Sequence, residues 1–373
     1  MTHGPHTRII AGLYGRILKP VLFRFDPEDV HDHATNLGKL LGTTVAGRAL
    51  TRTLFYYEHP SLHTTVCGIN FSNPVGLAAG FDKNARLYDI LPDVGFGFEE
   101  IGSITGRSCA GNPRPRLWRL PDSQALAVYY GLKNDGADAI SNRLRKKIFR
   151  FPIGISAAKT NDKETVDPGK AIADYCHVIS RFRGIGDYFT INISCPNAFG
   201  GEPFTDPELL DRLLSGVDAL ADKPIFLKLA VDLPTHRLDE IIEVCSRHRI
   251  DGFVCSNLTK NRVNMQIADA HVPEKCGISG RPVQQMSDEQ IRYIYRRTAG
   301  RYAIIGVGGI FTAEDAYRKI RLGASLVQLI TGMIFQGPQV AGEINYGLAQ
   351  LLKRDGYRTV SEAVGADNRP QLA

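Results

Sequence analysis

The feature that most constrains the fold is an alternation of apolar, strand-like runs with helical stretches beyond residue 60. Eight such runs can be counted, at residues 74–80, 96–105, 152–158, 188–195, 224–230, 252–258, 303–310 and 326–332. Strands that alternate with helices are typical of parallel α/β folds. Eight of them favour a (β/α)8 TIM barrel over a doubly wound sheet, because the GxGxxG opening usual after the first strand of such a sheet is missing.

The chain divides into an N-terminal extension, residues 1–59, and the barrel, residues 60–373. The extension has the pattern of two amphipathic helices. Residues 1–25 contain no acidic residue, while Ile9, Leu13 and Ile17 recur at helical spacing among basic side chains such as Arg16. Such a segment either packs on the main domain or lies on a membrane surface. A mitochondrial presequence is a further interpretation of the same pattern.

A second helix is predicted to begin at Asp26. This residue is a good N-cap, Pro27 suits the first helical position, and Glu28 and Asp29 place negative charge in the first turn. The apolar residues that follow at helical spacing are Val30, Ala34, Leu37 and Leu41. Their common face can be buried against the barrel or against lipid.

Composition excludes several classes of protein. The net charge of +6 from 45 basic and 39 acidic residues is too small and too dispersed to indicate nucleic-acid binding. The seven cysteines form no CxxC pair and have no zinc-ligand spacing, so no metal site and no disulfide framework is predicted. No run of about 18 apolar residues occurs, so a membrane-spanning helix is not expected.

Polar residues close most of the eight runs, and in a barrel all of these strand ends face one mouth. The pattern is clearest at Thr190–Asn197, where Pro196 ends an apolar run and leaves a thiol between two amides. The polar residues expected to converge are Lys83, Ser103, Thr105, Ser156, Lys159, Asn192, Cys195, Lys228, Ser256 and Asn257. A thiol at this place can act as a base.

Glycines follow the last two strands, at Gly306, Gly308, Gly309 and Gly332. Their backbone N–H groups can approach an anion, and phosphate sites recur at this position in TIM barrels. A phosphorylated cofactor is therefore expected. Two lysines in one mouth, Lys83 and Lys228, need partners, and a flavin satisfies both: Lys228 can stabilise negative charge on the reduced ring.

Four segments together resemble the dihydroorotate dehydrogenases: residues 73–83, 192–197, 277–282 and 306–310. The resemblance covers most of the chain. Phe25-Asp26-Pro27-Glu28 and its two helices look like the membrane-associated, quinone-using class 2 branch, whose N-terminal helices form a quinone tunnel. The resemblance implies a peripheral membrane protein, on the cytoplasmic face of the inner membrane in a bacterium.

The resemblance also assigns roles. It implies oxidation of dihydroorotate to orotate in pyrimidine biosynthesis, with Cys195 as the base for the C5 proton, hydride transfer from C6 to N5 of FMN, and reoxidation by a quinone. Lys83, Asn192, Asn197 and Asn257 would hold the pyrimidine. FMN would contact Ala78, Ala79, Gly80, Ser103, Lys228, Gly280, Gly309 and Thr331, and the pattern of strand ends adds Ser156, Ser256, Gly308 and Gly332.

The chain departs from the family at several positions. Cys195 is typical of the soluble class 1 branch, where class 2 has serine, and a thiol with a reference pKa of about 8.5 is the easier base. Val128 replaces a substrate-binding asparagine, Leu132 a phenylalanine and Lys133 an asparagine; Lys133 could compensate by pairing with an anionic group of the ligand. Ser156 stands in place of an asparagine beside the flavin, and Leu258 in place of a hydroxyl residue.

These departures leave alternatives open. One is an FMN-dependent dehydrogenase or reductase acting on a different small cyclic substrate, and another is a flavin-binding homologue that has lost turnover. A dihydrouridine-synthase-like enzyme is disfavoured, because only about 40 residues follow Gly332, too few for its RNA-binding domain. An electron-transfer protein is the alternative to a quinone as acceptor.

Overall fold

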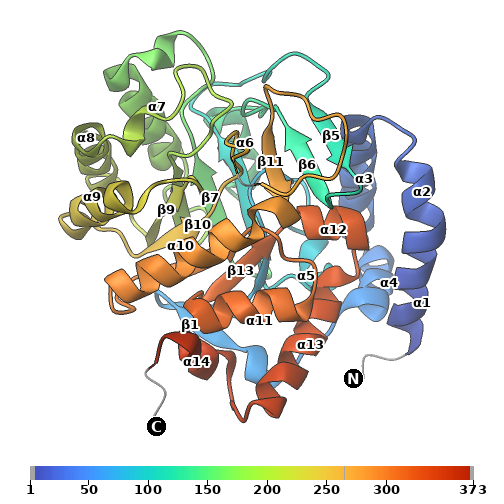
Figure 1. Ribbon diagram of the computed structural model, residues 1–373. Helices are drawn as coiled ribbons and strands as arrows, with labels where there is room; N and C mark the ends of the chain where they lie inside the picture. Colours follow the sequence, from blue (N-terminus) through green and yellow to red (C-terminus); the bar gives the residue numbers. More distant parts are fainter. Residues whose placement is uncertain (1–4, 264, 370–373) are drawn as a thin grey trace.

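The computed structural model describes residues 5–263 and 265–369, and its centre is a closed barrel of eight parallel strands (Figure 1). The order around the barrel is β10-β12-β13-β3-β4-β7-β8-β9, and β9 pairs with β10 to close it. The strands are β3 Val75–Leu77, β4 Phe98–Ile104, β7 Ile153–Ala157, β8 Tyr188–Asn192, β9 Ile225–Leu229, β10 Gly252–Cys255, β12 Ala303–Val307 and β13 Leu326–Leu329. All eight lie within the predicted runs, so the TIM barrel prediction is confirmed.

Helices surround the barrel; most connect successive strands, and three follow the last strand. They are α5 Leu91–Val94, α6 Ala137–Leu144, α7 Pro168–Arg181, α8 Pro207–Asp218, α9 Thr235–Ser246, α10 Gln284–Arg297, α11 Ala313–Leu322, α12 Thr331–Gln336, α13 Val340–Arg354 and α14 Val360–Ala363. Asp-Pro pairs begin two of them: Asp167 caps α7 and Asp206 caps α8 through their carboxylates. Proline supplies a preset φ at the first helical position, where no N–H is needed.

Two smaller sheets close the ends of the barrel. The hairpin of β1 Thr64–Val66 and β2 Ile69–Phe71 brings Phe71 into a cluster with the barrel residues Phe98, Tyr188 and Phe226, and this cluster fills the lower interior. At the opposite end, β5 Leu117–Leu120, β6 Ala125–Val128 and β11 Gly277–Gly280 form an antiparallel sheet in the order β11-β6-β5. This second sheet stands beside the mouth of the barrel.

A polar layer lies between the apolar cluster around Phe71 and the barrel mouth. The fully buried Glu100 of β4 accepts hydrogen bonds from the Thr190 hydroxyl, 2.9 Å, and from the Gln328 amide, 3.2 Å. Because these side chains come from three strands, the layer ties β4, β8 and β13 together inside the barrel. Buried polar groups that are paired in this way specify one arrangement of the core.

The described part of the N-terminal extension contains the two predicted helices and one more. It consists of α1 Pro5–Leu13, a π-helical turn Tyr14–Leu18, α2 Lys19–Leu22, α3 Pro27–Gly42 and α4 Val45–Phe55. Of these, α1, the π-helical turn and α2 follow one another without a break as the first predicted helix, α3 is the second, and α4 was not predicted. Figure 1 shows α1 and α2 running along one side of the molecule beside α4 and α3. Asp26 caps α3 as expected, accepting from the N–H groups of Glu28 and Asp29.

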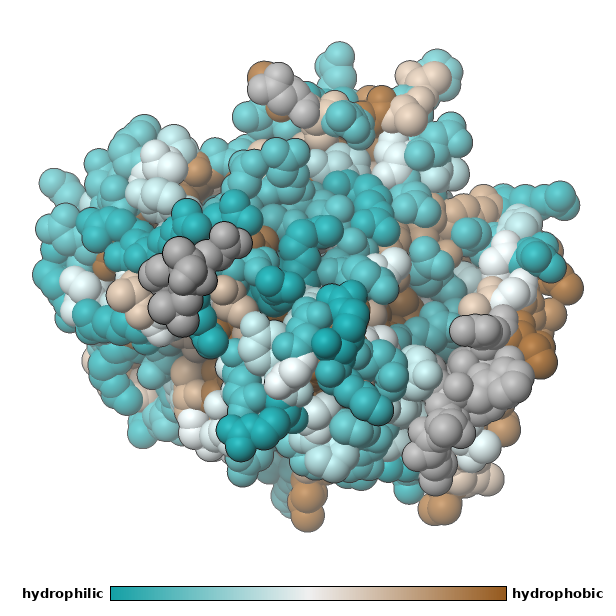
Figure 2. Space-filling model, turned by 60° about the horizontal axis from the view of Figure 1, so that its bottom comes forward, coloured by the Kyte–Doolittle hydropathy of each residue, from teal (hydrophilic) through white to brown (hydrophobic). Residues whose placement is uncertain are grey.

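The extension turns many of its apolar side chains outward. Helix α3 buries Glu28, Thr35 and Gly42, whereas Leu37 is 56% exposed and Leu40 is 64% exposed. The other exposed large apolar residues of the extension are Ile9, Leu13, Ile17, Leu18, Val21, Phe25, Val45 and Leu50. Figure 2 shows hydrophobic atoms gathered on the side where Figure 1 places α1 and α2. Within the described ranges no helix is both long and apolar enough to cross a membrane.

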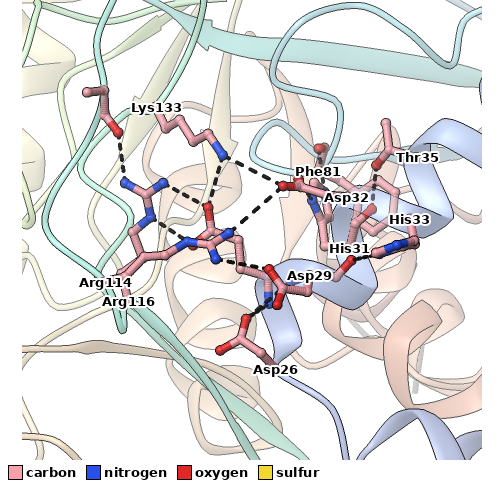
Figure 3. Close-up of polar contacts among 12 residues, drawn as sticks. Asp26, Asp29, His31, Asp32, His33, Thr35, Phe81, Arg114, Arg116 and Lys133 are labelled. Atoms are coloured by element: carbon pink, nitrogen blue, oxygen red, sulfur yellow. Dashed lines mark hydrogen bonds and ion pairs between the residues drawn. The ribbon is translucent and has the colours of Figure 1, made fainter.

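A buried cluster of charges fastens α3 to the barrel mouth (Figure 3). The Glu28 carboxylate is bidentate to Arg116, at 2.8 and 2.9 Å, and also meets Arg114 and Lys133 at 3.0 Å each. Burial by itself would raise the pKa of Glu28, but hydrogen bonds from Arg116, Lys133 and Arg114 lower it to about 2. The Arg116 guanidinium, itself buried, also donates to the carbonyl oxygens of Ala110 and Asn112.

We predict that Glu28→Gln lowers the free energy of unfolding by about 3–5 kcal/mol, because it leaves the buried Arg116 cation without its counter-charge. Urea unfolding at neutral pH measures the change. The lowered pKa of Glu28 means that its contribution is full above the unfolded-state pKa near 4.5 and is lost as pH falls towards about 2. The difference between wild type and variant should therefore shrink across that window.

The matched control is Asp29→Asn. Asp29 lies on the same helix as Glu28, and the change removes its exposed ion pair with Arg114. Such a pair is worth no more than about 1 kcal/mol. Equal stability of the two variants would show that the Glu28 cluster does not hold the extension in place.

Candidate active site

One large cavity opens at the C-terminal ends of the barrel strands. Its empty space is about 1330 Å³, part of which is open to solvent, and its lining is concave and mostly apolar with a few polar groups, as in small-molecule sites. The predicted site residues that line it are Ala78, Ala79, Gly80, Lys83, Ser103, Lys133, Asn192, Cys195, Asn197, Lys228, Ser256, Asn257, Gly280, Gly308, Gly309, Thr331 and Gly332. The barrel topology thus brings together residues more than 250 positions apart.

Three of the ten polar strand-end residues expected to converge do not line this cavity: Ser156, Thr105 and Lys159. Ser156 is fully buried, and its hydroxyl lies 2.8 Å from the Ser103 hydroxyl, behind the wall. The Thr105 hydroxyl donates to the carbonyl oxygen of Arg107 instead. Lys159 lies on a separate, smaller cavity that shares Cys195 with the main one. Direct contact of Ser156 with a bound cofactor is therefore not supported by its position.

The loop that carries Cys195 is anchored by amides at the ends of two strands. Asn192, the last residue of β8, donates to the Ser103 hydroxyl at 2.8 Å and accepts from the Ser194 N–H at 3.2 Å. Asn257, two residues beyond β10, donates to the Ser194 carbonyl oxygen at 2.6 Å. These bonds fix the chain just before Cys195, which is half-buried and faces the cavity.

Burial raises the pKa of the Cys195 thiol to about 11. The reference value for a free cysteine therefore overstates how easily this thiol deprotonates at neutral pH. A hydrogen bond from the Asn197 backbone N–H lowers this pKa, as do the charges of Lys159 and Lys260, while Glu202 adds to the rise. A base at this position depends on that N–H group and on the nearby positive charge.

Several buried polar atoms on the cavity wall have no hydrogen-bond partner among the described residues. They are the Ser256 hydroxyl, Oε1 of Gln328, Oδ1 of Asn197 and the Tyr130 hydroxyl. An unpartnered buried polar group costs about 1–3 kcal/mol, so native structures seldom leave one without a role. Their convergence on one cavity indicates a polar ligand there.

The loop after β12 presents free backbone donors to the same cavity. Neither Gly308 nor Gly309 donates its N–H to a partner within the described part of the chain. Gly309 has a φ of +69°, and a Cβ atom there would come within 2.3 Å of Gln284. Only glycine suits this turn, which leaves two adjacent N–H groups available for an anion.

Two lysines and a histidine complete the polar lining. Burial, reinforced by the charge of Lys133, lowers the pKa of Lys83 to about 8, and its ammonium lies 4.1 Å from the centre of the Tyr130 ring. Burial also lowers the pKa of Lys228, while Glu100 beneath it acts in the opposite direction. Burial and then Lys83 lower the pKa of His31 to about 4, so this side chain is neutral.

Lys133 lines the cavity, but its charge already has a protein partner. The ammonium lies 3.0 Å from Glu28 and 3.9 Å from Asp32, both on α3. The interpretation that Lys133 compensates for Val128 by binding the ligand therefore competes with its role in the cluster of Figure 3.

One wall of the cavity is apolar. It consists of Leu117 and Leu126 of the antiparallel sheet with Val128, Leu132 and Leu258. The carbonyl oxygen of Val128 accepts a hydrogen bond from the Asn197 amide at 3.0 Å, so this wall and the Cys195 loop are in direct contact.

Sequence reasoning missed several cavity residues, among them His31, Phe81, Tyr130 and Gln328. His31 follows Glu28 by three positions, which places both on one face of α3, and this spacing was the available signal. Its Nε2 lies 2.9 Å from the carbonyl oxygen of Phe81. No group of acidic, histidine or cysteine side chains in the described ranges has the arrangement of a metal site.

Comparison with known proteins identifies similar chains. Residues 61–352 match the family model described as dihydroorotate dehydrogenase. A dihydroorotate dehydrogenase (quinone) of Natronomonas pharaonis is 40% identical over 95% of this chain and 99% of its own length, and one of Anaeromyxobacter dehalogenans is 41% identical over 94% and 96%. The crystal structure of DHODH from Eimeria tenella in complex with ferulenol has 30% identity and a TM-score of 0.84, over 94% of this chain and 99% of that one.

Proposed function

The chain belongs to the dihydroorotate dehydrogenase family, and on that premise we propose that it oxidises dihydroorotate to orotate with Cys195 as the base and a quinone as electron acceptor. The observation that carries the proposal is the meeting of Lys83, Asn192, Cys195, Asn197 and Asn257 in one cavity. A cation, a thiol and three amides suit a small anionic ring from which a proton must be removed.

We propose that the cofactor is FMN, because the cavity has the donors and free polar atoms that this group needs. The N–H groups of Gly308 and Gly309 would hold the phosphate, and Lys228, Ser256 and Gln328 would face the ring. Ala78, Ala79, Gly80, Ser103, Gly280, Thr331 and Gly332 would complete the site. When bound, FMN supplies the acceptor for the hydride that dihydroorotate loses.

Cys195 takes the C5 proton of the substrate in this proposal. As a thiolate it accepts that proton and becomes a thiol, which then returns the proton to solvent. Asn192 and Asn257 hold the loop through Ser194, so the sulfur stays at a fixed distance from the ring. Lys83, which has no carboxylate bonded to it among the described residues, is the candidate partner for the substrate carboxylate.

We propose that residues 1–59 give a quinone access from a membrane surface to the cavity. The exposed apolar side chains of α1 to α4 suit a peripheral contact with lipid, and Arg16 and Arg24 add positive charge. Phe23 packs edge-to-face on Phe335 of α12, within an apolar cluster that includes Leu117 and Leu126 of the cavity wall. This cluster connects the extension with the cavity.

A second candidate is oxidation of a less polar cyclic substrate by the same residues, and the apolar wall of Val128, Leu132 and Leu258 favours it. The two candidates predict different behaviour of Val128→Asn. With dihydroorotate as substrate, the new amide should lower KM by about 5- to 150-fold, because it pairs a polar group of the ligand that costs about 1–3 kcal/mol when it is buried without a partner. Steady-state orotate formation measures this, with Val128→Ala as the control that adds no hydrogen bond. Failure of both wild type and Val128→Asn to form orotate would favour the second candidate.

A further inference from the structure

Cys195 lines both the main cavity and a second, much smaller one. The empty space of the small cavity is about 220 Å³, part of which is open to solvent. Its lining includes Lys159, Tyr175, Ala198 and Phe204 as well as Cys195. Cys195 is therefore part of the wall of both the substrate cavity and a pocket that contains Lys159.

Lys159 is a buried cation with no ion pair among the described residues. It follows β7 and is 4% exposed, and its ammonium donates to the carbonyl oxygen of Phe199. Phe199 belongs to the same loop as Cys195, four residues further along. A buried ammonium held only by a neutral carbonyl is costly, so a negative charge that forms beside it gains stability.

The two carboxylates that act on Lys159 are already bonded elsewhere. Asp174 accepts from the Thr160 N–H at 2.7 Å, from the Thr160 hydroxyl at 2.9 Å and from the Gly106 N–H at 3.1 Å. Asp162 forms an ion pair with Arg107 at 2.6 Å. Neither carboxylate is bonded to the Lys159 ammonium. The ammonium instead donates its hydrogen bond to the loop that carries Cys195.

Other titratable groups face this loop as well. Tyr175 of α7 donates its hydroxyl to the Asn192 carbonyl oxygen at 2.7 Å, and burial raises its pKa, so it stays neutral. Burial and then Asp232 raise the pKa of Glu202 to about 7, which makes it a partly protonated group near neutral pH. Lys260, beyond β10, is the second cation that acts on Cys195.

We propose that Lys159 is the positioning residue for the base: its ammonium stabilises the Cys195 thiolate, and its hydrogen bond to Phe199 fixes the loop that carries the sulfur. This rests on the proposed function in assigning Cys195 as the base. The proton balance is closed, because the thiolate takes one proton from the substrate and later releases it to solvent, while Lys159 keeps its own protons throughout.

The test is the pH dependence of Cys195 alkylation by iodoacetamide in the full-length protein, followed by mass spectrometry of the Cys195 peptide. Only the thiolate reacts, so the profile reports the thiol pKa. Lys159→Gln keeps a donor for Phe199 but removes the charge, and Lys159→Arg keeps both. We expect Lys159→Gln to slow alkylation at pH 8 by about 10-fold or more, as expected for loss of a nearby opposite charge, and Lys159→Arg to restore it.

The half-buried cysteines Cys67 and Cys176 are internal references, and their profiles should not move. An unchanged Cys195 profile in Lys159→Gln would overturn the proposal, as would an equal change in Lys159→Arg. The pH dependence of the rate of dihydroorotate oxidation should also change in Lys159→Gln. The part of that profile assigned to the base should move along the pH axis by as much as the alkylation profile does. Alkylation needs no substrate, so this test is independent of the reaction. If Lys159→Gln changed the pH profile of Cys195 alkylation in a protein that does not oxidise dihydroorotate, the role of Lys159 would stand and only the proposed function would be contradicted.

Discussion

Cys195→Ala should slow flavin reduction by dihydroorotate at least about 100-fold, because removal of a positioned base typically costs about 10²- to 10⁴-fold. The flavin itself should stay bound. The groups proposed to hold it include the glycine loop after β12, Lys228 of β9 and Gln328 of β13, and these make no hydrogen bond to the Cys195 side chain. Anaerobic rapid mixing of the variant with dihydroorotate measures the rate.

Cys176→Ala is the matched control, since it removes a half-buried thiol from α7, away from the main cavity. It should reduce its flavin at the wild-type rate. Reduction of Cys195→Ala at that same rate would show that another group takes the proton, and the assignment of the base would be wrong.

Removal of residues 1–24 should abolish turnover with a membrane quinone, a loss of more than about 10-fold, while flavin reduction by dihydroorotate stays within about twofold of wild type. The truncation takes away α1, the π-helical turn and α2. With them go the Tyr14 hydroxyl, which donates to the Ile334 carbonyl oxygen at 2.7 Å, and the ring of Phe23 just after α2. The truncation spares Asp26 and Glu28, so α3 keeps its cap and its ion pairs. A cut at residue 41 would instead leave Arg116 buried without its counter-charge.

A water-soluble electron acceptor provides the control for this truncation. Turnover with that acceptor should persist, because the cavity itself stays intact. If the shortened chain still used the membrane quinone at the wild-type rate, the extension would not be the access route, and an electron-transfer protein would become the better candidate acceptor.

The barrel could be predicted from the sequence because its signals are local. Each strand is a short apolar run bounded by turn residues, as in residues 224–230 and 252–258, and eight runs in alternation with helices leave few topologies. The position of the site could then be predicted from the barrel topology, because the ends of parallel strands meet at one mouth whatever their separation in sequence. Cys195, Lys228 and Asn257 converge for this reason.

Contacts between distant loops could not be predicted in the same way. The short strands β6 and β11 pair across about 150 residues, and no local pattern in either specifies the partner. Lys133 pairs with Glu28, 105 positions away, so its role in the charge cluster was not evident from its neighbours. Ser156 is absent from the cavity lining although it lies on a predicted strand, because a predicted strand does not fix which of its residues reach the cavity at its end.

Burial changed two interpretations that rested on residue type alone. A free thiol has a pKa near 8.5, but desolvation raises that of Cys195 to about 11, so the cations around it become essential to the account. The apolar face of α3 was expected to pack either on the barrel or on lipid, and the exposed Leu37 disfavours the barrel, since the buried face is formed by Glu28, Thr35 and Gly42. Small side chains and a paired carboxylate allow the helix to approach the barrel closely.

The central claim is that this site oxidises dihydroorotate despite its apolar wall. The most direct test is anaerobic stopped-flow mixing of the wild-type protein with dihydroorotate while the absorbance of the oxidised flavin is followed. The account predicts rapid bleaching with the release of orotate. A bound flavin that stays oxidised at saturating dihydroorotate would contradict it.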